Sequence, residues 1–195
     1  MLFSKIQPWS KQKLLKKGKI PSINDIIIIA NELELRTKAL FILAYLSAGR
    51  IQELVRDKNK KLPSIKKKDL IVIDKKNRKI MLIGIRNEKN KNKTNKEIPI
   101  PLDREENIRF WNLLIEYLNQ LELDDELFPF NYQRAYKLLI ETGFNPHWLR
   151  HIRLTHCVTI YDFNEMELMQ IAGWSDPRPA KHYIELRWSD LLNKL

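Results

Sequence analysis

The sequence predicts a mainly α-helical domain of the α+β class with one small three-stranded antiparallel sheet. Two β-branched runs, at residues 70–73 and 79–83, flank a short polar segment and so indicate a hairpin. Stretches whose apolar residues recur at helical spacing lie on both sides of this hairpin. The chain has 195 residues, of which 44% are hydrophobic and 30% charged, enough for one domain with a real core.

The chain begins with a basic segment, residues 1–21, which we expect to form a tail or linker before a domain over residues 22–195. Ser22 with Asp25 matches a capping box, which predicts a helix through about residue 34. A strongly apolar helix should follow over residues 36–47. Gly49 then stands where that helix should turn over.

The predicted sheet follows a lysine-rich connection at residues 56–68. Its hairpin turn covers residues 74–78, and a third strand is expected over residues 98–102. Proline cannot donate to a strand ladder, so Pro99 and Pro101 place that third strand at an edge of the sheet.

The second half of the chain is predicted to be helical throughout. Residues 104–121 carry an apolar stripe at helical spacing, which we expect to face the core: Ile108, Trp111, Leu114, Ile115 and Leu118. The remaining predicted helices cover residues 131–142 before Gly143, residues 146–161 from Pro146, a short segment from Asn164 to Gly173, and residues 179–195.

The positive charge is concentrated in one part of the sequence. The formal net charge is +11, and residues 56–96 hold sixteen Lys or Arg against four Asp or Glu. A local basic excess favours a polyanionic partner such as nucleic acid. The alternative is a solvated lysine-rich loop in a protein from an AT-rich genome. The lysines that we expect to contact DNA are Lys66, Lys67, Lys68, Lys89, Lys91 and Lys96.

Other features exclude several classes of protein. The longest apolar run, residues 39–46, is too short to cross a bilayer, and the N-terminus lacks a signal-peptide core. The single cysteine, Cys157, cannot form an intrachain disulfide. We therefore expect a cytoplasmic protein with no membrane association.

Four short motifs contain residues that could take part in catalysis. Arg50 follows a glycine and precedes Glu53 by one helical turn, which is also the spacing of an ordinary surface ion pair. Lys93 lies on a polar turn before the third strand, and taken alone it indicates an ordinary solvated turn.

The other two motifs lie near the C-terminus. His147, Arg150 and His151 begin a helix, and an arginine on the inner face of a helix favours an anionic partner. Trp174 follows Gly173, and Tyr183 comes nine residues later. Taken singly, a histidine here is more often a cap or a core residue, and a tyrosine near a C-terminus is usually structural.

In this order and spacing, the motifs together resemble the catalytic domain of the tyrosine recombinases, the family of phage integrases and chromosome-dimer resolvases. The resemblance runs from about Ile20 to the C-terminus. It implies site-specific cleavage and rejoining of DNA strands through a covalent 3′-phosphotyrosine, and thus DNA recombination and integration. The implied catalytic residues are Arg50, Lys93, His147, Arg150, Trp174 and Tyr183, with Glu53 and His151 in support.

The resemblance also implies a role for each residue. Tyr183 is the nucleophile, and two guanidinium forks, Arg50 and Arg150, bind the non-bridging phosphate oxygens. An indole N–H, that of Trp174, donates to the same phosphate. Lys93 protonates the departing 5′ oxygen, and His147 takes the tyrosine proton. With two arginines to stabilise the charge, we expect no metal or other cofactor and no ATP requirement.

The expected partner is double-stranded DNA, with a homotetramer on paired sites and a monomer in free solution. Members of the family usually carry an N-terminal DNA clamp, whereas only about 20 residues precede the domain here. We therefore expect either that another chain supplies the clamp or that this is a minimal or truncated recombinase. Two other functions remain open: a type IB topoisomerase-like enzyme with nearly the same side chains, and a non-catalytic DNA-binding regulator that retains the fold.

Overall fold

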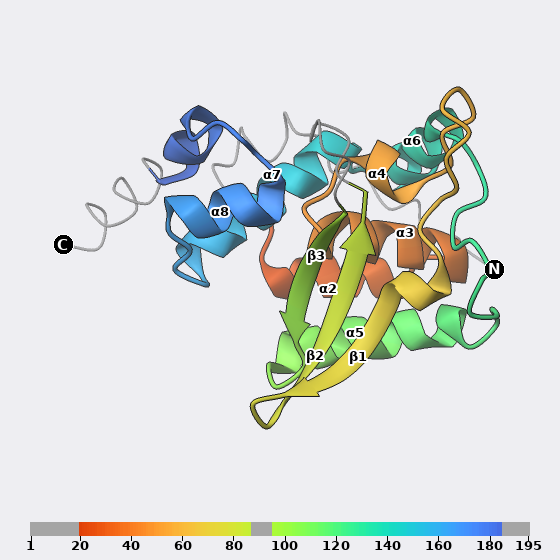
Figure 1. Ribbon diagram of the computed structural model, residues 1–195, viewed down its shortest axis with the longest axis horizontal. Helices are drawn as coiled ribbons and strands as arrows, with labels where there is room; N and C mark the ends of the chain where they lie inside the picture. Colours follow the sequence, from red (N-terminus) through yellow and green to blue (C-terminus); the bar gives the residue numbers. More distant parts are fainter. Residues whose placement is uncertain (1–19, 87–94, 185–195) are drawn as a thin grey trace, which may run out of the picture.

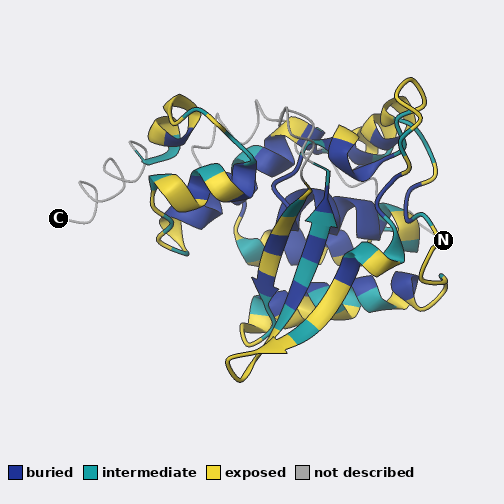
Figure 2. Ribbon diagram, in the orientation of Figure 1, coloured by how far each residue is buried: buried dark blue, intermediate teal, exposed yellow. Residues whose placement is uncertain are grey.

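The computed structural model describes residues 20–86 and 95–184, and its three-stranded sheet lies against a layer of helices (Figure 1). Helix α3 (Leu35–Leu46) is central: it contacts α2 (Ile23–Asn31), α5 (Glu105–Leu118) and α7 (Pro146–Thr159). Every residue of α3 from Lys38 onward is buried, which explains its unbroken apolar sequence (Figure 2). The predicted α+β class is confirmed.

Helix α2 begins as the sequence predicts and ends sooner. The Ser22 side chain accepts from the Asp25 backbone N–H, and the Asp25 carboxylate accepts from the Ser22 N–H, which completes the capping box. The helix stops at Asn31, three residues before the expected end. Helix α3 then begins at Leu35 after a short turn.

The sheet has the order β1–β2–β3, with β1 at Leu70–Lys75, β2 at Arg78–Ile85 and β3 at Lys96–Pro101. Both pairs are antiparallel, and β3 lies at an edge as its prolines predicted. The hairpin turn is tighter than expected. Lys76 and Asn77 both have positive φ, 53° and 60°, as a two-residue type I′ turn requires.

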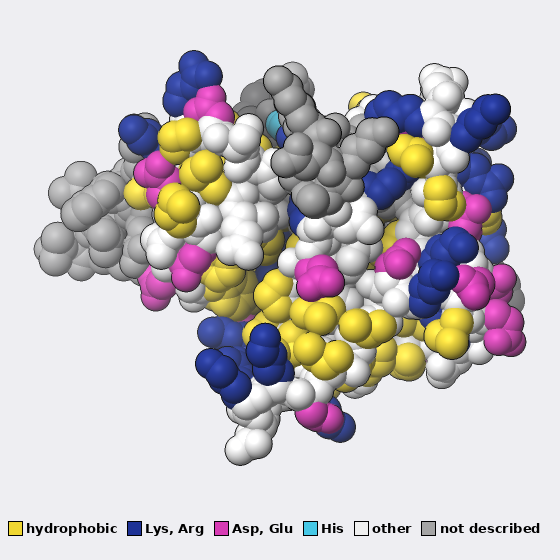
Figure 3. Space-filling view, viewed as in Figure 1, with side chains coloured by type: hydrophobic (Ala, Val, Ile, Leu, Met, Phe, Trp, Pro, Cys, Tyr) yellow, Lys and Arg dark blue, Asp and Glu magenta, His cyan; other side chains and the backbone are white. Residues whose placement is uncertain are grey.

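The outer face of the sheet is apolar. Ile71, Leu82 and Pro99 stand in register across the three strands, and hydrophobic side chains gather over this face (Figure 3). The opposite face supplies core residues such as Met81, Ile83 and Ile100, all of them buried. The sheet thus fixes β3 against the helical layer.

The turn after α3 differs from the sequence prediction. The residue in the left-handed conformation is Ala48, with φ 44°, and not Gly49. Gly49 is needed for space: a Cβ there would lie 2.9 Å from both Ile85 Cδ1 and Ser47 Oγ. This close packing brings Arg50, the N-cap of the short helix α4 (Ile51–Leu54), next to the sheet.

The buried stripe of α5 is rotated from the one predicted. Asn107, Phe110, Leu114, Tyr117 and Leu118 are buried, whereas Ile108 is 42% exposed and Trp111 is partly buried. The Asn107 side chain is stabilised in its inner position because Nδ2 donates to the Pro101 carbonyl at 2.8 Å, which ties the helix to the end of β3. A spacing pattern alone did not distinguish a polar tether from a solvent-facing asparagine.

The C-terminal helices begin and end close to the predicted positions. Asn131 caps α6 (Tyr132–Glu141), and Asn145 caps α7, which has Pro146 at its first position. Helix α8 (Glu165–Ala172) is capped by Asn164 and ends at Gly173 in the left-handed conformation, with φ 67°. Residues 178–184 form one further helical stretch, and the rest of the predicted last helix lies outside the described residues.

Candidate active site

Arg150 is the centre of the candidate site. It lies on α7, is only 6% exposed, and donates from one terminal nitrogen to the Ala48 carbonyl and from the other to the Ala172 carbonyl, the latter at 2.9 Å. Burial, and next the nearby Arg50, lower the pKa of Arg150 to about 10, so its guanidinium stays charged at neutral pH. It therefore joins the turn after α3 to the end of α8.

Arg50 lies beside it and is held by Glu53. The Glu53 carboxylate is fully buried and accepts from the Arg50 backbone N–H at 2.9 Å and from its guanidinium at 3.2 Å. The Arg50 side chain remains 22% exposed. The supporting role predicted for Glu53 thus has a geometric basis: it fixes the guanidinium and the backbone of the same residue.

Tyr183 lies near three residues that the sequence had singled out. Its ring centroid is 5.9 Å from that of Trp174 and 5.2 Å from that of His151. The Arg150 guanidinium carbon lies 5.5 Å from the Trp174 ring centroid. Burial raises the pKa of Tyr183, partly opposed by Arg150, so the phenol is protonated at neutral pH and needs an acceptor before it can attack.

His151 is the histidine whose contact with that phenol is described. Its Nδ1 lies 3.1 Å from the Tyr183 hydroxyl. His147, to which the sequence assigned the tyrosine proton, is an exposed residue of the first turn of α7. The two histidines are four residues apart, so they share one stripe of the helix, and the i, i+4 spacing was the available sequence signal for His151.

The lysines of the basic region are placed in different ways. Lys89, Lys91 and Lys93 lie outside the described residues. Lys66 and Lys68 face Asp124, at 3.6 and 2.5 Å, and Lys67 donates to the Leu121 carbonyl at 2.6 Å. Lys96 is turned into the candidate site, 3.3 Å from Glu53.

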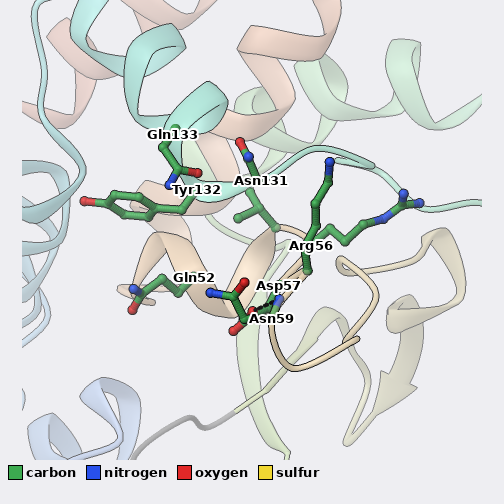
Figure 4. A pocket seen from close by; sticks show the side chains of 9 residues that line it. Gln52, Arg56, Asp57, Asn59, Asn131, Tyr132 and Gln133 are labelled. Carbon is green, nitrogen blue, oxygen red and sulfur yellow. Dashed lines mark hydrogen bonds between the residues drawn. The ribbon is translucent and has the colours of Figure 1, made fainter.

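A separate polar pocket of about 260 Å³ lies between the end of α4 and the start of α6 (Figure 4). Its walls include the side chains of Gln52, Arg56, Asp57, Asn59, Asn131, Tyr132 and Gln133. Among the predicted catalytic residues that the structure describes, none lines it. The candidate site is therefore the cluster around Arg150 and Tyr183, and this pocket is distinct from it.

Residues 20–86 and 95–184 contain no group of three or more His, Cys, Asp or Glu side chains placed to hold a metal ion. The helices in the same ranges include none long and apolar enough to span a membrane.

Comparison with solved structures identifies the fold. The whole chain superimposes on part of the XerH site-specific recombinase in its post-cleavage complex with palindromic difH substrate, with a TM-score of 0.65 and 15% identity. XerA recombinase matches over 90% of this chain with a TM-score of 0.61 and 18% identity. The Flpe–Holliday junction complex matches over 86%, with a TM-score of 0.52 and 15% identity.

The chain has the fold of a tyrosine recombinase catalytic domain. It spans 57% of the XerH chain, 64% of the XerA chain and 49% of the Flpe chain. The sequence itself matches no protein-family model and no curated protein. The recombinase fold is thus established by structure, at identities too low to carry residue roles across.

Proposed function

We propose that this protein cleaves and rejoins DNA strands through a covalent 3′-phosphotyrosine on Tyr183. The observation that carries the proposal is the gathering of Tyr183, His151, Trp174 and Arg150 within one cluster, with Arg50 beside it. Similarity to site-specific recombinases supports the same activity.

In the proposed cleavage step, the Tyr183 oxygen forms a bond to the DNA phosphorus while the bond from phosphorus to the 5′ oxygen breaks. His151 Nδ1 takes the phenol proton at the 3.1 Å contact, and Lys93 gives a proton to the departing 5′ oxygen. Religation runs the same step backwards. The broken phosphodiester is conserved as a phosphotyrosyl ester, so the step needs no ATP.

The two arginines stabilise the transition state by charge. Phosphoryl transfer places extra negative charge on the non-bridging oxygens, and planar guanidinium forks bind such oxygens through paired hydrogen bonds. Arg150 is already held in place by two backbone carbonyls and Arg50 by Glu53. Fixing these donors before the substrate arrives reduces the reorganisation needed during the reaction.

The test is covalent trapping on a nicked suicide substrate. The wild-type protein should form a protein–DNA adduct that survives boiling in detergent, and Tyr183→Phe should form none while retaining DNA affinity, because only the phenol oxygen is removed. Tyr132→Phe, at an exposed tyrosine of α6, is the matched control. An adduct from the Tyr183→Phe variant, or none from wild type, contradicts the proposal, and the latter leaves a DNA-binding regulator.

Two comparisons refine the mechanism. His151→Gln should slow adduct formation more than His147→Gln does, and the reverse order would return the proton acceptor to His147. Recombinant junctions from paired sites identify a recombinase, whereas supercoil relaxation alone identifies a topoisomerase-like enzyme.

A further inference from the structure

Lys96, the first residue of β3, has an unusual setting for a lysine in a basic region. Its side chain is only 9% exposed, and Nζ lies 3.3 Å from Glu53 Oε2 and donates to the Ile171 carbonyl at 3.3 Å. Lysine is rarely buried unless it is paired, because its ammonium group loses hydration. The side chain therefore has a specific inward role, unlike an ordinary solvated lysine.

Charged groups near Lys96 attract or repel its ammonium group. Glu53 is the carboxylate that attracts it, whereas Arg150 and Arg50 both oppose its charge. Burial is the largest effect and lowers the pKa of Lys96 to about 8, so the ammonium form still predominates at pH 7. The Glu53 carboxylate thus pairs directly with Arg50 and Lys96, and its charge also favours the charged form of Arg150.

The two groups that Lys96 contacts, Glu53 and the Ile171 carbonyl, are next to the groups that hold Arg50 and Arg150 in place. Glu53 also holds Arg50, through its backbone and its guanidinium. Ile171 directly precedes Ala172, whose carbonyl accepts from Arg150. These carbonyls lie at the C-terminal end of α8, where the helix dipole favours cations, and Gly173 and Trp174 follow at once.

We propose that Lys96 is a positioning residue that ties α4 to the end of α8 and so sets Arg50, Arg150 and Trp174 relative to one another. It acts through Glu53 and the Ile171 carbonyl and transfers no proton. The inference rests on the proposed function for its kinetic consequence, although the tie itself is testable in the free protein.

The kinetic test compares two leaving groups. Lys96→Met keeps roughly the length of the side chain and removes its charge. It should slow cleavage of ordinary DNA at least tenfold. It should slow cleavage of DNA with a 5′-bridging phosphorothioate by the same factor, although the sulfur leaving group needs no proton. Lys93 is the proposed general acid, so Lys93→Met should cleave the phosphorothioate DNA at close to the wild-type rate. Lys137→Met, at an exposed lysine of α6, is the matched control and should cleave as wild type.

The pair is then tested for coupling. Lys96→Met leaves the buried Glu53 with one cation fewer. The fold loss in cleavage rate caused by Glu53→Gln should therefore be at least tenfold smaller in the Lys96→Met background than in the wild-type protein. Rescue of Lys96→Met by the sulfur leaving group would make Lys96 a proton donor and overturn the inference. Additive effects of the two substitutions would also overturn it.

A spectroscopic measurement separates this inference from the activity. In ¹H–¹⁵N spectra of the free protein, Lys96→Met should shift the indole resonance of Trp174, assigned with Trp174→Phe, and leave those of Trp111 and Trp148 in place. Unchanged Trp174, or equal shifts of all three, would refute the positioning role. This readout applies even if the wild-type protein forms no adduct, in which case the proposed function alone fails.

Discussion

His156 gives a quantitative prediction about how this fold depends on pH. It lies on α7, the helix of Arg150 and His151, and is 4% exposed. Its Nε2 contacts the Pro21 carbonyl at 2.9 Å and its Nδ1 contacts the Tyr45 hydroxyl at 2.7 Å. A carbonyl only accepts, so Nε2 carries the proton and donates, and Tyr45 donates to Nδ1.

This arrangement requires a neutral imidazole. Burial, and next the positive charge of Arg153, lower the pKa of His156 from 6.5 to about 4. The unfolded chain therefore binds a proton below pH 6.5 that the folded protein does not bind until about pH 4. Stability is fully present above pH 6.5 and is lost as the pH falls toward 4; between pH 7 and pH 5 the loss is about 2 kcal/mol.

The assay is urea unfolding of wild type and His156→Gln at pH 7, 6 and 5. Glutamine does not titrate, so the free energy of unfolding of the variant should fall by about 2 kcal/mol less than that of wild type over this range. His182→Gln, at an exposed position, is the control and should follow wild type. Parallel pH profiles for wild type and His156→Gln would refute a buried neutral His156.

Three further predictions concern the proposed chemistry. Arg50→Ala and Arg150→Ala should each slow cleavage by roughly 10²–10³-fold or more, measured as single-turnover adduct formation, because each removes positioned transition-state donors; a loss below tenfold contradicts their role. Cleavage should continue in EDTA at moderate salt, since the arginines supply the charge stabilisation, and restoration by Mg²⁺ after loss in EDTA would indicate another nuclease mechanism. Light scattering should show a monomer in free solution and a tetramer on DNA with paired sites; a stable tetramer without DNA is the contrary result.

Local sequence rules predicted most helix and sheet boundaries because those boundaries depend on local contacts. Ser22, Asn131 and Asn164 each cap a helix through a hydrogen bond to a residue three positions later, and Gly173 ends α8 in the conformation that glycine favours. The edge position of β3 followed from its prolines.

Long-range contacts account for what the sequence did not predict. Gly49 looked like a helix terminator, yet Ala48 takes the left-handed conformation. One of the two closest contacts that leave no room for a Cβ at Gly49 is with Ile85 on β2, far along the chain. Lys96 looked like one more DNA-contacting lysine among many, and only the approach of β3 to α4 and α8 shows that it faces Glu53. Sequence periodicity predicts neither the contact of Gly49 with Ile85 nor the packing of β3 near α4 and α8.

The residues of the candidate site were singled out by their chemistry, and their catalytic roles stay a prediction. Arginine and glutamate on one short helix, arginine beside histidine on another, and a tryptophan nine residues before a tyrosine had ordinary structural explanations one at a time. The fold brings Arg150, Trp174, His151 and Tyr183 together from α7, the turn after α8 and residues 178–184. Both histidines of this helix stripe were singled out, and the 3.1 Å contact of His151 with the Tyr183 hydroxyl is the one from which its proposed role is argued.

The electrostatics of the site bear on how the proposed reaction begins. Arg50, Arg150 and Lys96 influence one another, and Glu53 is the carboxylate that offsets them. The arginines oppose the charge of Lys96, and Arg50 opposes that of Arg150, so a phosphate bound between the arginines would relieve both repulsions. Such binding should raise the pKa of Lys96 and keep its ammonium on Glu53 and the Ile171 carbonyl. In the proposed function, the substrate therefore strengthens the same tie that positions its own arginines, and DNA affinity should weaken as the pH rises through 8 in wild type but not in Lys96→Met.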